Sequence, residues 1–375
     1  GIQFEVTSAE DFSTDEKFDF VILSDILNEV WDVQELLENV RERLDPGGRL
    51  LINVYSRLWE LPLRMAEKAG LSKPGLGENW LTVPDIRNLL YLSGFETIRS
   101  SHEILFPIGI PGLRSFFNKF LVRFWPFNHM ALTNFLVARV VDNAHSHQSS
   151  PLVSVIVPAR NEAGNIENIL KRMPQMGGGT EVVFVEGNSS DDTWQVILDR
   201  VKACPQYRCQ TLQQTGKGKG DAVRLGYEKA SGEILMILDA DLTVPPEDLP
   251  RFYDALVSGK GDFINGVRLV YPMEDQAMRF FNLLGNKFFS LTFSWLLGQP
   301  VKDTLCGTKV LWKKDYEKIA ANRHVFGDFD PFGDFDLLFG AARLNFKIID
   351  LPIRYRARTY GTTNIERWKH GLLLL

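Results

Sequence analysis

The side chains best suited to chemistry are two carboxylates one residue apart, Asp239 and Asp241, which directly follow an apolar run at 234–238. At this spacing two anions repel each other by on the order of a few kcal/mol at an effective dielectric constant of about 20. We therefore expect a cation beside them, and oxygen ligands at a sheet edge suit Mg²⁺ or Mn²⁺ bridging to a diphosphate. The alternative is a solvated strand end whose carboxylates cap the next helix.

Two more apolar runs, at 153–157 and 181–185, also end in polar residues. A glycine-rich stretch at 216–220 carries Lys219, where the glycines permit close backbone approach to a phosphate and the lysine supplies charge. Ligands of a doubly wound sheet bind outside the carboxyl ends of its strands, so we expect these residues to line one site with Asp239. The candidates after the two runs are Pro158, Arg160, Glu162, Glu186 and Asn188.

Three further groups of charged residues follow in the second half. Asp303 begins a short polar segment, and Asp334 and Asp336 stand where a helix pattern begins. These last two are candidates for orienting a second substrate or a metal, or else belong to a capped and solvated turn. Arginines alternate at 354, 356 and 358, so they share one face of an extended strand, which suits either phosphate contact or plain solvation.

Alternating strands and helices must position these side chains. In the first half we expect a strand at 18–23, a helix at 33–44, a turn at 45–48 and a strand at 49–54. The polar stretch 145–151 is predicted to be a linker, and buried-strand runs followed by helix patterns begin again after it. We therefore predict two α/β domains, at 1–144 and 152–375.

Composition excludes several classes of protein. The 375 residues hold 42 basic and 47 acidic side chains, a formal charge of -5, so no global positive field favours nucleic acid. The three cysteines include no CxxC pair, which argues against a disulfide framework or a zinc ribbon and favours a reducing compartment, the cytoplasm. A hydrophobic share of 45% is enough to build large cores.

In this order and spacing, the motifs of residues 152–375 resemble the family 2 glycosyltransferases of GT-A fold, most closely the polyprenol-phosphate branch. The resemblance assigns nucleotide-sugar binding to Pro158, Arg160, Glu162, Glu186, Asn188, Lys219 and Arg358, metal binding to Asp239 and Asp241, and catalysis to Asp239, Asp241, Asp303, Asp334 and Asp336. It implies an inverting enzyme that uses Mg²⁺ or Mn²⁺ to move a sugar from a nucleotide-diphosphate donor. The implied acceptor is polyprenyl phosphate at the cytoplasmic face of a membrane, where the protein would be peripheral or anchored.

The nature of the acceptor decides whether a general base is needed. A phosphate monoester is already largely anionic near pH 7 because its second pKa is about 6, so it can attack without one. For a hydroxyl acceptor, Asp334 or Asp336 becomes the candidate base, to be judged first by geometry.

The first half resembles part of a class I S-adenosylmethionine-dependent methyltransferase. Residues 18–30 and 44–52 match its fourth strand and the turn into its fifth, and Glu10 or Asp11 stands where that family contacts adenine. The family's glycine-rich cofactor loop has no counterpart in the chain, so we expect neither S-adenosylmethionine binding nor methyl transfer. Two explanations of the missing loop are left open: the sequence is truncated, or the domain is degenerate. The alternative function is a methyltransferase whose second half serves as a sugar-nucleotide-binding module.

Two aromatic segments bear on membrane contact. Residues 278–297 carry only two charges and suit a pair of interfacial helices, the alternative being an ordinary core helix. Residues 104–141 mix phenylalanines with basic side chains and suit either an interfacial helix or a surface that packs the two domains together. Four leucines at 372–375 follow a basic run, which is a pattern with which a membrane segment could begin.

Overall fold

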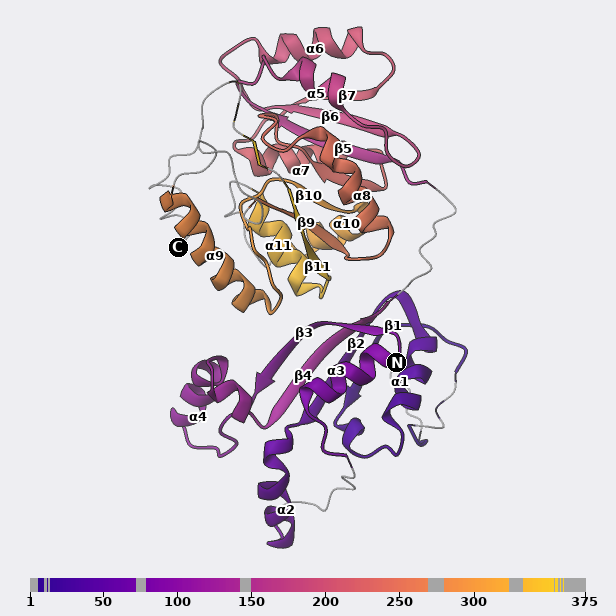
Figure 1. The fold of residues 1–375 in the computed structure, drawn as a ribbon, viewed down its shortest axis with the longest axis vertical. Coiled ribbons are helices and arrows are strands. Elements are labelled where there is room, and N and C mark those ends of the chain that lie inside the picture. The colour runs from indigo at the N-terminus through magenta and orange to yellow at the C-terminus, as the bar shows by residue number, and fades with distance from the viewer. Residues whose placement is uncertain are drawn as a thin grey trace. The chain divides into compact units, whose positions relative to one another are not determined.

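The chain divides into two compact units, Gly1–Asn143 and Ala144–Leu375, each built around its own sheet (Figure 1). The structure is a computed structural model, and within 280–287 it describes the backbone alone. It describes residues 6–9, 12, 14–71, 79–141, 150–268, 280–323, 333–353, 355–356, 358 and 360. Most of the predicted linker at 145–151, and the predicted adenine contacts Glu10 and Asp11, lie outside this set.

A four-stranded mixed sheet in the order β1-β2-β4-β3 forms the centre of the first unit. Strand β1 runs parallel to β2, whereas β4 is antiparallel to both of its neighbours. Its strands are β1 (Phe18–Ser24), β2 (Leu44–Tyr55), β3 (Phe95–Glu103) and β4 (Thr133–Val140). Helices α1 (Val33–Arg43) and α3 (Val83–Leu92) contact each other and bury their apolar residues in one core with the sheet.

The remaining helical elements of the first unit are short. They are η1 (Ile26–Asn28), η2 (Arg57–Trp59), α2 (Glu60–Lys68), α4 (Leu113–Ser115), the π-turn η3 (Phe116–Phe120), η4 (Leu121–Arg123) and η5 (Phe127–Met130). Of the two alternatives for 104–141, one helix over the whole segment is therefore wrong, because helical turns end at Met130 and a buried strand follows. The expected turn at 45–48 is also wrong, because β2 already begins at Leu44 and these residues form an irregularity in its pairing with β1.

The second unit contains a seven-stranded sheet in the order β11-β9-β10-β8-β5-β6-β7. Its strands are β5 (Val153–Ala159), β6 (Thr180–Glu186), β7 (Arg208–Gln213), β8 (Ile234–Ile237), β9 (Phe263–Val267), β10 (Lys309–Trp312) and β11 (Ile348–Pro352). All neighbouring pairs are parallel except those of β10, which is antiparallel to both β8 and β9. Because β6 and β8 lie on opposite sides of β5, the strand order reverses there, which is where doubly wound sheets bind ligands.

Helices cover both faces of this sheet. Val155 and Val157 of β5 pack on the face covered by α5, α6 and α8, whereas Ile156 packs on the face covered by α7, α9, α10 and α11. This alternation follows from the two-residue period of a strand. The helices are α5 (Ile166–Arg172), α6 (Thr193–Ala203), α7 (Lys219–Lys229), the 3-10 turn η6 (Pro246–Asp248), α8 (Leu249–Val257), α9 (Phe280–Leu297), α10 (Lys313–Ala321) and α11 (Asp334–Arg343).

The helix pair expected at 278–297 is instead one continuous helix, α9. The segment holds no proline that would break it, and Gly298, with φ of 65°, ends it in the left-handed conformation that glycine adopts at low cost. Within the part of the chain that the structure describes, we find no helix with the length and apolar character needed to span a bilayer.

Helix α7, whose first turn carries Lys219, lies close to the sheet at Gly226. A Cβ atom on Gly226 would lie 2.6 Å from Cγ2 of Ile156 and 3.2 Å from Cγ2 of Val185. These distances are shorter than ordinary van der Waals contacts, so the helix can approach this closely only with glycine there.

We expect Gly226→Ala to destabilise the second unit, because overpacking costs about 1–3 kcal/mol and outweighs the roughly 1 kcal/mol gained in helix propensity. Thermal unfolding followed by circular dichroism measures the effect. Gly47→Ala is the control, because a Cβ atom there would meet nothing within 4 Å. A Gly226→Ala protein as stable as the control would contradict the close packing.

Candidate functional site

The polar residues predicted to form a site do gather at the carboxyl ends of β5, β6 and β8. Glu162 follows β5, Glu186 ends β6, and Asp239 and Asp241 follow β8. Lys219 reaches the same edge from the first turn of α7. The parallel pairing of β6, β5 and β8 brings these strand ends together, as the sequence predicted.

The centre of the site is an ion pair between Lys219 Nζ and Asp239 Oδ1, 2.6 Å apart. Burial raises the pKa of the Asp239 carboxyl, but the charge and hydrogen bond of Lys219 outweigh burial and hold that pKa below its usual value. Burial lowers the pKa of Lys219, but Asp239 and Asp334 outweigh it and raise that pKa. Both groups therefore stay charged at neutral pH.

Gly307 makes room for this ion pair. A Cβ atom on Gly307 would lie 2.2 Å from Oδ2 of Asp239 and 2.3 Å from Nζ of Lys219. Any other residue at this position would displace one of the two partners. The backbone thus lies directly against the carboxylate and the ammonium group.

A second cluster surrounds Asp241. Arg358 donates from Nη2 to Asp241 Oδ2 at 2.7 Å and from Nη1 to Glu162 Oε1 at 3.2 Å. Thr243 donates to the other Asp241 oxygen from its backbone N–H and its hydroxyl. Burial raises the pKa of Glu162, although Asn165, which donates to Oε2 at 2.7 Å, and Arg358 oppose this. Arg358 thereby joins the loops after β5 and β8.

The loops after β5 and β6 lie against each other. Asn161 donates its backbone N–H to the Ser189 hydroxyl, and its side chain accepts from the backbone N–H of Ser190. Glu186 is buried and accepts from the backbone N–H of Ser189 at 2.5 Å. Of the other predicted nucleotide contacts, Pro158 is half-buried, and Arg160 and Asn188 are exposed at the same edge.

Asp303 is wholly buried, and both of its oxygens are engaged within the fold. Arg268 donates from Nε to Oδ2 at 2.7 Å and from Nη2 to Oδ1 at 2.8 Å. Burial raises the pKa of Asp303, but the Arg268 guanidinium outweighs this and holds it below its usual value. All contacts seen for Asp303 are structural, so its predicted catalytic role stays a prediction. The arginine itself was not singled out from the sequence.

Asp334, the first residue of α11, lies near the central ion pair. Its Oδ1 is 3.4 Å from Nζ of Lys309, a lysine with no exposed surface that also donates to Asn265 Oδ1 and to the Cys306 carbonyl. Helix α11 begins against helix α7, because a Cβ atom on Gly333 would lie 2.8 Å from Cα of Gly220. Sequence reasoning did not assign Lys309 a role, although a lysine within an apolar strand was a usable signal.

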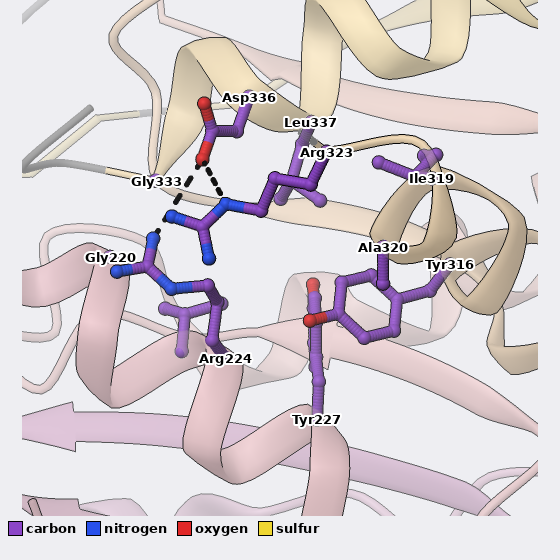
Figure 2. Close-up of a pocket in the computed structure, with 11 residues that line it drawn as sticks. Gly220, Arg224, Tyr227, Tyr316, Ile319, Ala320, Arg323, Gly333, Asp336 and Leu337 are labelled. Atoms are coloured by element: carbon purple, nitrogen blue, oxygen red, sulfur yellow. Dashed lines mark ion pairs between the residues drawn. The ribbon is translucent and has the colours of Figure 1, made fainter. Parts of the chain in front are cut away.

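Asp336 lies in a separate small pocket. Figure 2 shows Arg224 and Arg323 converging on Asp336, whose Oδ2 is 3.2 Å from Arg323 Nε and 3.8 Å from Arg224 Nη1. The rings of Tyr227 and Tyr316, with centroids 4.6 Å apart, form the opposite wall. The free volume of about 20 Å³ has room for about one water molecule. Asp334 and Asp336 therefore occupy different surroundings, and only Asp334 belongs to the Lys219 group.

The carboxylates of Asp239 and Asp241 are the oxygen donors that Mg²⁺ and Mn²⁺ accept, and such ions commonly use one or two carboxylates together with substrate phosphates. Among the residues placed by the structure, no group of three or more histidine, cysteine, aspartate or glutamate side chains could hold a metal alone. The donor set thus fits a cation that shares its ligands with a diphosphate. Such a cation would compete with Arg358 for Asp241. Arg354 lies outside the described residues.

We expect Asp303→Asn to lower the free energy of unfolding by about 3–5 kcal/mol at pH 7, because it leaves a buried guanidinium without its counter-charge. Urea denaturation measures this. Asp248→Asn, which removes the half-buried partner 3.8 Å from the exposed Arg251, is the control and should cost about 1 kcal/mol or less.

The same comparison predicts a pH dependence. The pKa of Asp303 is lowered in the folded state, so its stabilisation is complete above the ordinary carboxyl pKa of about 3.9 and disappears as pH falls through the lower folded-state value. The stability difference between wild type and Asp303→Asn should be constant near neutral pH and shrink below about pH 4. A difference independent of pH would refute the charge argument.

Comparison with known proteins identifies both units. Residues 154–319 match the family model for glycosyl transferase family 2, and residues 2–100 match the model for a methyltransferase domain. A dolichol-phosphate mannosyltransferase of Pyrococcus furiosus is 27% identical over 57% of this chain and 59% of its own length. An undecaprenyl-phosphate 4-deoxy-4-formamido-L-arabinose transferase of Edwardsiella ictaluri is 25% identical over 60% of this chain and 64% of its own length.

Among solved structures, glucosyl-3-phosphoglycerate synthase of Mycobacterium tuberculosis, with Mn²⁺, uridine diphosphate and glucosyl-3-phosphoglycerate, aligns at a TM-score of 0.45 and 18% identity. The alignment covers 61% of this chain and 78% of that protein. The chain spans about 60% of the length of the two curated relatives above. The motifs at the sheet edge and the matched family models agree on one assignment: the second unit is a family 2 glycosyltransferase domain of α/β fold, preceded by a methyltransferase-like domain.

Proposed function

We propose that the second unit transfers a sugar from a nucleotide-diphosphate sugar to a polyprenyl phosphate. The observation that carries this proposal is the grouping of Lys219, Asp239, Asp241, Glu162 and Arg358 at the point where the strand order reverses. Two cations and three carboxylates at one sheet edge suit a diphosphate and the metal that accompanies it. The relatives named above, whose acceptors are dolichol phosphate and undecaprenyl phosphate, support the choice of acceptor.

The transfer is a single displacement that inverts the configuration at C1 of the sugar. An oxygen of the acceptor phosphate forms the new bond to C1, and the bond from C1 to the donor diphosphate breaks, so that the nucleoside diphosphate leaves with the electron pair. Lys219 and Arg358 would stabilise the negative charge that develops on this leaving group. A divalent cation held by Asp239 and Asp241 would add to that neutralisation.

The acceptor phosphate needs no general base, because it is largely ionised near pH 7. Should the acceptor carry a hydroxyl instead, Asp334 is the better placed of the two predicted bases. It contacts Lys309 and lies beside the first turn of α7, whereas Asp336 is held between Arg224 and Arg323. Glu162, with Arg358 and Asn165, would hold the nucleoside end of the donor.

Helix α9 supports a lipid acceptor. Phe288, Leu291 and Trp295 are 55%, 67% and 47% exposed and lie three and four residues apart, so they form one stripe of the helix. The opposite stripe packs inward, where Phe293 stacks on Phe335 with ring centroids 5.1 Å apart. An exposed apolar stripe without a charge would face the acyl region beside the acceptor, which supports a reaction at a membrane surface. We propose the cytoplasmic side of that membrane.

We expect Asp241→Asn to reduce sugar transfer by about 10²–10³-fold, because it removes charge from the group that handles the diphosphate. Transfer of radiolabelled sugar to a short-chain polyprenyl phosphate in detergent, with a panel of nucleotide sugars, measures it. Asp199→Asn on the exposed face of α6 is the matched control. An Asp241→Asn protein as active as the control would rule out this site.

Removal of divalent cations tests the metal separately. We expect a chelator to abolish transfer in wild type, and we expect Mn²⁺ or Mg²⁺ to restore it. Isothermal titration of the nucleoside diphosphate with and without Mn²⁺ gives a readout that does not need the acceptor, and tighter binding with the metal is expected. Full transfer in the chelated protein would exclude a metal-dependent reaction.

A further inference from the structure

Large apolar side chains are exposed together on one segment of the first unit. Phe116, Phe120 and Trp125 are 51%, 55% and 79% exposed. Ring contacts link the group, with centroids 5.8 Å apart between Phe116 and Phe120 and 5.1 Å apart between Phe120 and Phe124. The aromatic surface, as we call it, comprises Ile108, Ile110, Leu113, Phe116, Phe120, Phe124, Trp125, Phe127 and Met130.

This segment is anchored to the unit at several points. Asn118 donates from its side chain to the Phe106 carbonyl at 2.9 Å and accepts from the Phe106 backbone N–H at 2.7 Å. Trp59 donates from Nε1 to the Met130 carbonyl at 2.9 Å, and Val122 is 1% exposed. Hydrogen bonds to backbone groups and the burial of Val122 therefore hold the segment that carries the aromatic surface.

The Lys, Arg, Asp and Glu side chains of the segment are all of one sign. Residues 104–130 contain Arg114, Lys119 and Arg123 but no aspartate or glutamate, in a chain whose formal charge is -5. Arg114 and Lys119 are exposed and stand in the sequence next to Leu113 and Phe120 of the aromatic surface. Aromatic rings mixed with basic side chains are the composition that binds the interface of an anionic bilayer, where rings enter the headgroup region and cations meet lipid phosphates.

A second exposed apolar group of the same unit, on α2, differs from the aromatic surface in the charges around it. On α2, Leu61 and Met65 are 72% and 70% exposed, but they lie among charges of both signs. The acidic residues are Glu60 and Glu67 and the basic ones Arg64 and Lys68, of which Arg64 lies 3.0 Å from Glu60. Such a surface has no excess of positive charge to attract anionic lipid. Of these two groups, the aromatic surface is the one that combines exposed rings with charge of one sign, which favours a lipid surface over a mixed-charge protein partner.

We propose that the aromatic surface of the first unit binds the interface of anionic membranes and so holds the chain at the surface where lipid acceptors reside. Its rings lie at the depth of the headgroups, and Arg114 and Lys119 contact lipid phosphates. The binding does not depend on the sugar transfer proposed for the second unit.

Flotation of the full chain with vesicles tests the proposal. We expect wild type to float with vesicles of phosphatidylcholine and phosphatidylglycerol and to bind at least tenfold more weakly to phosphatidylcholine alone. The triple variant Phe116→Ser, Phe120→Ser, Trp125→Ser and the double variant Arg114→Glu, Lys119→Glu should each lose at least tenfold in partitioning to the anionic vesicles. The matched control, Leu61→Ser with Met65→Ser, should bind as wild type does.

Each other outcome overturns the proposal. It fails if wild type stays unbound, if the triple variant floats as wild type does, or if the control loses as much binding as the triple variant. A wild-type dimer that the triple variant converts to a monomer, without vesicle binding, would assign the surface to a second copy of the chain.

Thermal unfolding confirms that the variants are folded. The charge-reversal variant, which leaves every ring in place, separates membrane binding from stability. Transfer to the short-chain acceptor in detergent should be equal in wild type and the triple variant, so a failure of catalysis and a failure of membrane binding are distinguishable.

Discussion

The ion pair between Lys219 and Asp239 is the contact on which the arrangement of the candidate site depends. It joins the first turn of α7 to the end of β8, and glycines allow other segments to lie close to it. Gly307 leaves room for both partners, and Gly333 lets α11 begin against Gly220 of α7. Gly307 therefore lies against the two opposite charges, and α11 begins against the residue that follows Lys219.

Pairing of this kind recurs throughout the second unit. Asp241 and Glu162 share Arg358, Asp303 holds Arg268, and Asp336 lies between two arginines. Burying a carboxylate is costly unless a cation or hydrogen bonds compensate it. These acidic residues have basic partners, whereas the buried Glu186 accepts hydrogen bonds from the Ser189 backbone and the Gln213 side chain. A diphosphate and its cation would bind here by replacing these ion pairs. The phosphates would contact Lys219 and Arg358, and the cation would contact the carboxylates. At the sheet edge, Lys219 and Arg358 face three carboxylates, those of Asp239, Asp241 and Glu162, so this group has an excess of negative charge before any ligand binds.

Much of the fold could be predicted because its signals are local. Apolar runs such as 153–157 and 181–185 are buried strands, and the polar residues that follow them lie at one edge, as parallel pairing requires. Segment 104–141 failed as a helix because Phe135 and its neighbours form a strand between β2 and β3, a pairing that depends on partners far along the chain. The expected turn at 45–48 failed for a similar reason, since pairing with β1 extends β2 back to Leu44.

The sequence by itself determined that the chain has two α/β parts and which motifs belong to the second. It also determined that Lys219, Asp239, Asp241 and Glu162 gather at one sheet edge, because residue order and the two-residue period of strands carry that information. Only the tertiary structure decided the partners. It paired Asp303 with Arg268 and Asp334 with Lys309, and it separated Asp336 from Asp334 although they are two residues apart. The physical reason is that side chains two apart near the start of a helix point about 200° apart around its axis, so what each one meets depends on the elements packed there.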